Sequence, residues 1–173
     1  MATLHLISGL PCSGKTTYAA AVRADLSAVM FSLDCWLITA FGRYDIATVG
    51  HQEHTRRVLA CRELIWQPAS ELLRRGVDVV LDDGFFLRNH RVRHLTLAAA
   101  AGAAAKIHYL DTPLETIRQR LEARNARLPA FNFEIDSGLL IGFRGLFEVP
   151  SSDEGAEVVV VGEPSAFTDR RFV

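Results

Sequence analysis

Residues 4–16 read Leu-His-Leu-Ile-Ser-Gly-Leu-Pro-Cys-Ser-Gly-Lys-Thr and contain the pattern Gly9-x-x-x-x-Gly14-Lys15-Thr16, which is typical of a phosphate-binding P-loop. An apolar, strand-like run precedes the pattern and a helix-forming run follows it, so strand, tight loop and helix start occur in the required order. The backbone N–H groups of such a loop surround phosphate oxygens, and the positive end of the helix points at the same phosphates. The stretch therefore predicts a nucleotide site.

The side chains of this loop have distinct expected roles. We expect Lys15 to reach the β and γ phosphates and the Thr16 hydroxyl to ligate Mg²⁺. Cys12 is interpreted as a small loop residue and not as a nucleophile, because its position in the pattern tolerates most residues. The alternative for the whole loop is a glycine turn that merely joins a strand to a helix. The other loop residues expected to bind ATP are Gly9, Pro11, Cys12, Ser13, Gly14 and Thr17.

The composition indicates one globular domain, residues 1–173, in which 49% of the residues are apolar. A formal net charge of −1 argues against a protein that mainly coats nucleic acid. There are 17 Arg and only 2 Lys, and one of the two lysines is Lys15 in the loop. The chain therefore keeps a rare residue at the position where a phosphate contact is expected.

The three cysteines are odd in number and have no CxxC or metal-finger spacing, so we expect free thiols in a reducing cytoplasm. No signal peptide or membrane span is predicted, because the first apolar run is short and continues into the loop. We expect a soluble, cytoplasmic protein without membrane partners, and the sequence leaves monomer and homodimer open.

Asp34 follows the second expected strand, residues 28–32, at its carboxyl end. Ligands of open α/β sheets bind at this edge, so Asp34 is placed to bind the acceptor and accept a proton from its hydroxyl. The alternative is an N-cap for a helix over residues 35–41.

Residues 35–75 are expected to form a helical insertion that holds the acceptor, with a long helix over residues 51–75. Its aromatic residues favour a ring-bearing acceptor. At the start of the long helix the sequence leaves open substrate contacts or a solvated charged face. The residues concerned are His51, His54, Arg56 and Arg57.

An apolar strand over residues 77–81 leads into Asp82 and Asp83, which is the Walker B arrangement of a carboxylate beside the P-loop. Neighbouring residues of a strand point to opposite faces, so only one of the two faces the metal. We assign Asp82 to Mg²⁺ and Asp83 to a cap or a substrate contact, and the choice between them stays open. Arg88 and Arg91 are candidate contacts for a phosphate or acidic group of the substrate, and the alternative is a helix surface.

A strand over residues 104–110 precedes a helix over 114–126, on which Arg120 and Arg124 share one face. With the loop that follows, residues 124–136 are expected to form a lid over the transferring phosphate. The alternative is pairing of these arginines with nearby glutamates. The last strand is expected over 157–161, and the sequence leaves open whether the tail, 162–173, lies near the adenine or is loose.

Four features now stand in order: GLPCSGKT, Asp34, DDGFF at residues 82–86, and the arginine-bearing helix after YLDTP. Together they resemble the small bacterial P-loop kinases of the group that includes chloramphenicol phosphotransferase, the zeta toxins and the kinase domain of polynucleotide kinase. The resemblance extends over nearly the whole chain. It implies an α/β, three-layer P-loop fold with a five-stranded parallel sheet in the order 2-3-1-4-5, helices on both faces and a lid.

The resemblance further implies transfer of the γ-phosphoryl group of ATP to a hydroxyl, with Mg²⁺ on Thr16 and Asp82 and with Asp34 as base. Lys15, Arg120 and Arg124 fall on the positions that stabilise the transferring group. The acceptor is expected to be a small molecule such as an antibiotic or nucleoside-like compound, as in a self-resistance phosphotransferase. Two alternatives stay open: a kinase of nucleic acid 5′-hydroxyl ends, and a nucleotide-binding regulator or toxin-like module. The absence of an NKxD motif favours ATP over GTP.

Overall fold

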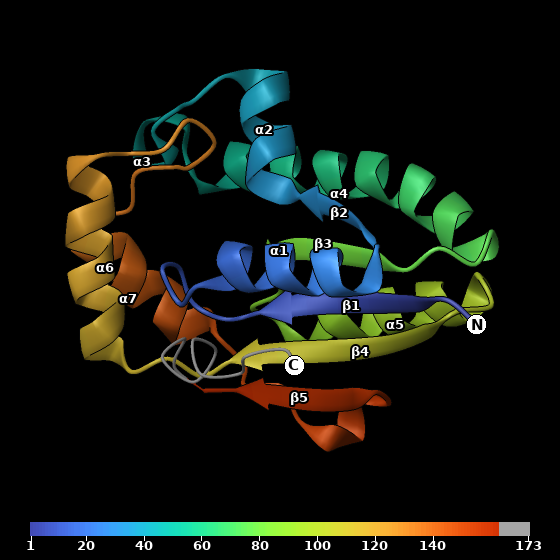
Figure 1. Cartoon of the computed structure of the whole chain (residues 1–173). Helices are drawn as coiled ribbons and strands as arrows, with labels where there is room; N and C mark the ends of the chain where they lie inside the picture. Colours follow the sequence, from blue (N-terminus) through green and yellow to red (C-terminus); the bar gives the residue numbers. More distant parts are fainter. Residues whose placement is uncertain (163–173) are drawn as a thin grey trace.

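Five parallel strands form the central sheet of the computed structural model, which describes residues 1–162 (Figure 1). Their order is β2-β3-β1-β4-β5, which confirms the predicted topology. The sequence left open whether the C-terminal tail lies near the adenine, and residues 163–173 of this tail lie outside the described residues. The strands are β1 (Thr3–Ser8), β2 (Val29–Ser32), β3 (Val79–Gly84), β4 (Ala104–Leu110) and β5 (Glu157–Val161).

Helices pack on both faces of this sheet, with α1 on one face and α4 and α5 on the other (Figure 1). The helices are α1 (Lys15–Leu26), α2 (Leu33–Phe41), α3 (Ile46–Val49), α4 (His51–Arg74), α5 (Arg88–Ala100), α6 (Leu114–Ala126) and α7 (Ser137–Leu146), with a 3-10 turn, η1 (Ser152–Glu154). No helix within residues 1–162 is long and apolar enough to span a membrane.

The core follows from the alternation of side chains along the strands. Leu4 and Leu6 of β1 are fully buried in the larger cluster, together with Ile65 of α4. Ile7 points to the opposite face and packs with Ala19 of α1. Burial on both faces is the usual state of a parallel sheet, and it explains why these strands read as almost continuous apolar runs.

The carboxyl ends of the strands face α6 and α7, which stand across that end of the sheet (Figure 1). The P-loop, the start of α2 and the end of β3 therefore meet at one edge. The third strand begins and ends later than predicted, because Asp82 and Gly84 still pair with β1. The two aspartates are part of β3 instead of following it.

Candidate functional site

The P-loop joins β1 to α1 in a tight turn that requires glycine at both ends. A Cβ on Gly9 would lie 2.8 Å from the Ser13 hydroxyl and 3.1 Å from the Leu110 carbonyl oxygen. Gly14 stands at the N-cap of α1 with φ 98°, in the left-handed region. The N–H of Gly9 donates to the carbonyl of Gly84, which holds the loop against the end of β3. The loop is therefore shaped by its glycines as the sequence predicts.

Lys15 is the first residue of α1. Its ammonium group donates a hydrogen bond of 2.7 Å to the Leu10 carbonyl oxygen within the same loop. Burial lowers the pKa of Lys15, and the nearby carboxylates of Asp82 and Asp34 act in the opposite direction. Lys15 thus lies inside the loop and faces both carboxylates of the site.

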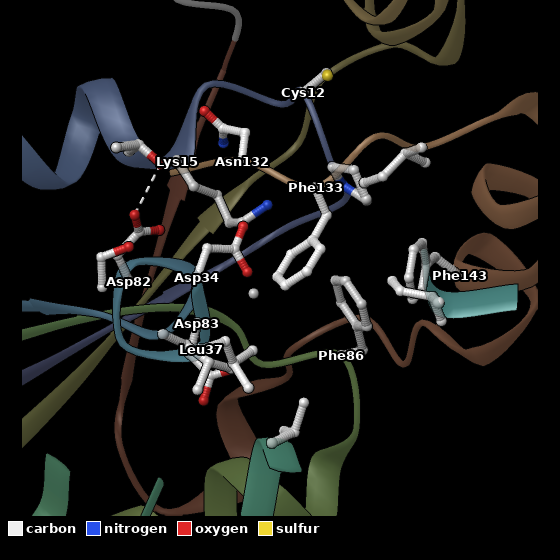
Figure 2. Close-up of a pocket in the computed structure, with 18 of the residues that line it drawn as sticks. Cys12, Lys15, Asp34, Leu37, Asp82, Asp83, Phe86, Asn132, Phe133 and Phe143 are labelled. Atoms are coloured by element: carbon white, nitrogen blue, oxygen red, sulfur yellow. Dashed lines mark hydrogen bonds between the residues drawn. The ribbon is translucent and has the colours of Figure 1, made fainter. Parts of the chain in front are cut away.

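Thr16 and Asp82 connect the P-loop to β3. The Thr16 hydroxyl donates a hydrogen bond of 2.8 Å to the Asp82 carboxylate, drawn as a dashed line in Figure 2. Burial raises the pKa of Asp82, while Lys15 and the bond from Thr16 partly offset this effect. A hydroxyl and a carboxylate side by side are the oxygen donors that Mg²⁺ binds together with nucleotide phosphates. The donor set fits a magnesium ion at this place.

Asp83 points away from the P-loop and is bound by α4. Arg62 donates from Nε and Nη2 to its two carboxylate oxygens, at 2.6 and 2.7 Å. The remaining nitrogen, Nη1, lies 3.0 Å from Nδ1 of His90. The structure therefore separates the neighbouring aspartates: Asp82 lies beside Thr16, and Asp83 forms an ion pair with Arg62.

Asp34 lies in the first turn of α2, in the wall of the same cavity. The N-cap interpretation is wrong, because Ser32 occupies the N-cap position. Burial raises the pKa of Asp34 to about 6; Lys15 opposes the shift and Asp82 adds to it. A carboxylate with a pKa close to neutrality, near the expected phosphate site, is suited to accepting a proton.

The arginines of α6 carry hydrogen-bond donors that are not used within the described residues. Arg124 donates from Nη2 to the Phe133 carbonyl at 3.1 Å, but its Nε is buried without a partner. Arg120 Nη1 and the Ser13 hydroxyl are buried and unpartnered as well. Buried donors are seldom left unpaired, so three such groups around a P-loop fit an anion such as a nucleotide phosphate. Arg124 lines the cavity, whereas Arg120 is not among its lining residues.

A cavity of about 550 Å³ joins the P-loop to the helical insertion. Figure 2 shows Lys15, Asp34 and Asp82 at one side of it. The other side is mainly apolar, although the Arg62–Asp83 pair, His54 and His90 also line it, and we call it the acceptor end. Its apolar lining residues are Leu37, Ile46, Val58, Leu59, Phe86 and Phe143, with Phe133 from the loop after α6.

The loop after α6 closes over the insertion. The rings of Phe133 and Tyr44 are 4.9 Å apart, and the Tyr44 hydroxyl lies 3.0 Å from Nδ1 of His54. Arg43 donates to the backbone carbonyls of residues 129 and 130, at 2.7 and 2.8 Å. The expected lid and the expected acceptor region are thus in direct contact.

For the start of α4 the sequence left open substrate contacts or a solvated charged face, and the structure shows residues of both kinds. His54 lines the cavity. Arg56 and Arg57 instead bind Glu53, at 2.7 and 2.8 Å, as expected of a charged helix face. His51 is exposed and does not line the cavity.

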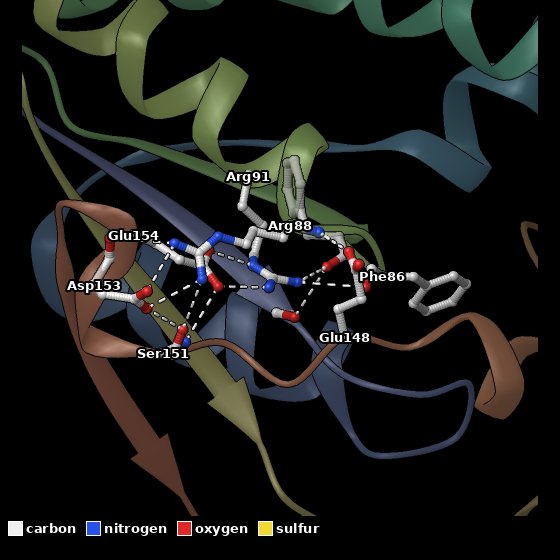
Figure 3. A network of polar contacts seen from close by, with 9 residues as sticks. Phe86, Arg88, Arg91, Glu148, Ser151, Asp153 and Glu154 are labelled. Atoms are coloured by element: carbon white, nitrogen blue, oxygen red, sulfur yellow. Dashed lines mark hydrogen bonds and ion pairs between the residues drawn. The ribbon is translucent and has the colours of Figure 1, made fainter.

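Arg88 is not brought to the cavity. Its guanidinium pairs with Asp153 at 3.0 Å, which places it against the segment before β5 (Figure 3). Next to it, Arg91 forms a completely buried pair with Glu154, with both side chains 0% exposed, and also donates to the Phe85 carbonyl. These pairs attach Asp153 and Glu154 to the start of α5, and the N–H of Glu148 donates to the Phe86 carbonyl at 2.9 Å. The expectation of a substrate contact at Arg88 or Arg91 is therefore corrected, because both guanidinium groups serve this attachment.

Several cavity residues have no predicted role in the sequence. Arg62 could not be distinguished from other arginines of its helix, since its partner Asp83 is 21 residues away. Phe133 lies in the predicted lid loop. The only sequence signal for its role was an aromatic residue between Pro129 and Asp136. Further examples are Phe86, His90, Asn132 and Phe143.

Comparisons with known proteins agree with this geometry. A family model described as an AAA domain matches residues 4–138. No curated protein matches the sequence. Among solved structures, a proposed kinase from Chloroflexus aurantiacus is 18% identical with a TM-score of 0.74, over 99% of this chain and 92% of that chain. Kti12 from Chaetomium thermophilum, in complex with ADP-AlF3, is 17% identical with a TM-score of 0.69, over 92% and 88%.

A sugar kinase from Janibacter sp. HTCC2649 is 16% identical with a TM-score of 0.62, over 98% of this chain and 92% of that chain. Identities this low establish the fold alone. The fold is that of the P-loop kinases, as the motif order implied.

Proposed function

The chain belongs to the AAA domain family, and we propose that it is a Mg²⁺- and ATP-dependent kinase of a small molecule that carries a hydroxyl group. The observation that supports this most is the single cavity in which the P-loop and Asp34 face an apolar acceptor end. The similarity to a sugar kinase supports a small-molecule acceptor. A ring-bearing compound of the antibiotic or nucleoside type suits the aromatic lining.

The P-loop residues, with Arg124 and Arg120, would hold the ATP phosphates, because their buried unpartnered donors need an anion. Thr16 and Asp82 would hold Mg²⁺. Bound there, Mg·ATP supplies the phosphoryl group, and the metal neutralises charge on its oxygens.

The residues of the chain would act on the acceptor and on the developing charge. Asp34 would orient the acceptor hydroxyl and take its proton, which its pKa of about 6 permits at neutral pH. Lys15 and the α6 arginines would stabilise negative charge on the group in transfer. Phe133, held against Tyr44, would exclude water, which would otherwise compete with the acceptor for the phosphoryl group.

The test is to incubate the purified protein with ATP and Mg²⁺ against hydroxylated antibiotics, nucleosides and 5′-hydroxyl oligonucleotides, and to read product mass directly. A gain of one phosphoryl group on a small compound is the expected result. Phosphorylation of oligonucleotides alone would support the nucleic-acid alternative. Nucleotide binding with no acceptor modified in any class would contradict the kinase proposal and favour a regulatory module.

A further inference from the structure

Among the residues that the structure describes, the acceptor end of the cavity contains one arginine, and its charge is already compensated. Arg62 forms two hydrogen bonds to Asp83, and its third nitrogen lies against His90. The side chains of Arg62 and Asp83 are only 10% and 7% exposed. A buried bidentate pair of this kind does not release its arginine to a ligand without leaving the aspartate unpaired.

The other cations near the acceptor end are also engaged. Arg57 is bound to Glu53 at 2.8 Å, and Arg43 is bound to two carbonyls of the lid loop. Lys15 and Arg124 lie at the phosphate end, where the proposed function uses them for ATP. Among the described residues that line the cavity, these two and Arg62 are the complete set of lysines and arginines.

The histidines do not supply the missing charge. His54 uses Nδ1 for the Tyr44 hydroxyl, and burial lowers its pKa. His90 lies against Arg62, and burial together with this guanidinium lowers its pKa too. Both rings are therefore mainly neutral at neutral pH.

Negative charge, in contrast, is present in the wall. Asp34, Asp82 and Asp83 all line the cavity, and within residues 1–162 only Asp83 has an arginine as its partner. Apart from the uncharged Thr55, the remaining surface of the acceptor end consists of aliphatic and aromatic side chains. An acidic group placed there would lose water, gain no unpaired cation from the described part of the chain and face the Asp34 carboxylate.

We propose that the acceptor is an apolar, ring-bearing alcohol without negative charge, and that the site discriminates against alcohols that carry a carboxylate, sulfate or phosphate group. The inference rests on the proposed function in so far as the bound alcohol is taken to be the phosphoryl acceptor. The preference for an uncharged ligand is a property of the cavity itself. It can therefore be measured by binding alone.

The experiment uses pairs of hydroxymethyl aromatic compounds that differ only in a carboxamide or a carboxylate, for example the two 4′-hydroxymethyl-biphenyl-4-carboxylic acid derivatives. Ligand-detected NMR and the shift in thermal unfolding measure binding to the full chain at pH 7.5. We expect the carboxamide members to bind at least about tenfold more tightly than the carboxylates. Equal affinities, a preference for carboxylates, or no binding by any carboxamide member would overturn the inference.

A reversal variant with a matched control sharpens this result. Leu59→Arg places a cation in the lining of the acceptor end, at a side chain 41% exposed that can accept the change without loss of fold. Leu64→Arg places the same charge on the same helix at a residue 49% exposed and outside the cavity. We expect the carboxylates to gain roughly tenfold in affinity only in the Leu59 variant. A similar gain in both variants, or in neither, would contradict a charge-selective acceptor end.

Failure of this inference is distinguishable from failure of the proposed function. If the carboxamides bind selectively but no ATP-dependent mass gain occurs on any compound, the kinase proposal fails and the ligand class stands. If carboxylated or phosphorylated alcohols are the preferred phosphoryl acceptors, the kinase proposal stands and the ligand class fails.

Discussion

The hydroxyl of Thr16 and the carboxylate of Asp82 are joined by a hydrogen bond of 2.8 Å across 66 residues of sequence. This contact brings the first turn of α1 against β3 at the carboxyl edge of the sheet. One residue later, Asp83 is held by Arg62 on the other side. The strand thus divides two neighbouring carboxylates between the P-loop and the acceptor end of the cavity, where we propose that the phosphates and the acceptor bind.

Replacing Lys15 should remove transfer and leave the fold intact. We expect Lys15→Ala to lower kcat by roughly 10²–10³-fold, because the ammonium would stabilise charge only in the transferring group. Product mass gives the rate, and circular dichroism with thermal unfolding gives the fold. The matched control is Lys106→Ala, since Lys106 is the other lysine and pairs with Glu157 at the surface. Near-normal turnover in a folded Lys15 variant would contradict the P-loop assignment.

Replacing Asp34 should separate proton transfer from binding. We expect Asp34→Asn to lower kcat by about 10²-fold or more if the carboxylate is the general base. The pKa of about 6 adds a signature: the active form is the carboxylate, so kcat/KM of the wild type should fall as pH drops below about 6 and level off above it. The variant should lose this inflection. An unchanged kcat with a raised KM would reduce Asp34 to a binding residue.

The buried pair of Arg91 and Glu154 should dominate local stability. Arg91→Met leaves the Glu154 carboxylate buried without a cation, so we expect a loss of about 3–5 kcal/mol in the free energy of unfolding. Urea denaturation measures this change. The control is Arg93→Met, which removes the exposed partner of Glu63 and should change stability by less than about 1 kcal/mol. If both variants lose the same amount, the attachment of residues 148–154 does not depend on the buried pair.

A buried histidine pair should make the protein sensitive to acid. His5 Nδ1 lies 2.9 Å from His108 Nε2, and the Tyr18 hydroxyl lies 2.8 Å from His108 Nδ1. Burial lowers the pKa of His108 from 6.5 to about 4. The unfolded chain therefore binds the proton more strongly, so this stability is present above about pH 6.5 and is lost as pH falls toward about 4.

The measurement is the free energy of unfolding at pH 7.5 and at pH 5, compared between wild type and His108→Gln. We expect the wild type to lose roughly 2 kcal/mol more than the variant between these two values. His51→Gln, on the exposed start of α4, should behave as the wild type. An identical pH dependence in all three proteins would show that the pKa of His108 does not change on unfolding.

Local sequence patterns were sufficient to predict the shape of the P-loop and the residues that form it. Gly9, Gly14, Lys15 and Thr16 are neighbours in sequence, and their chemistry follows from the turn they form, so their placement could be predicted without a structure. The strand order followed from the resemblance to P-loop kinases. The position of Asp34 also followed from the rule that parallel strands end at a common edge.

The acceptor half depended on contacts between distant segments. Asp82 and Asp83 are equivalent in sequence, and only the packing of α1 and α4 on either side of β3 assigns one to Thr16 and the other to Arg62. The sequence alone allowed Arg88 to contact the substrate. In the structure its guanidinium instead binds Asp153, which lies 65 residues later, in the segment before β5. A local sequence pattern specifies the shape of the backbone. The charged groups that a cavity offers a ligand are those that have not formed ion pairs with side chains from distant segments. Only the tertiary structure decides which of these ion pairs form.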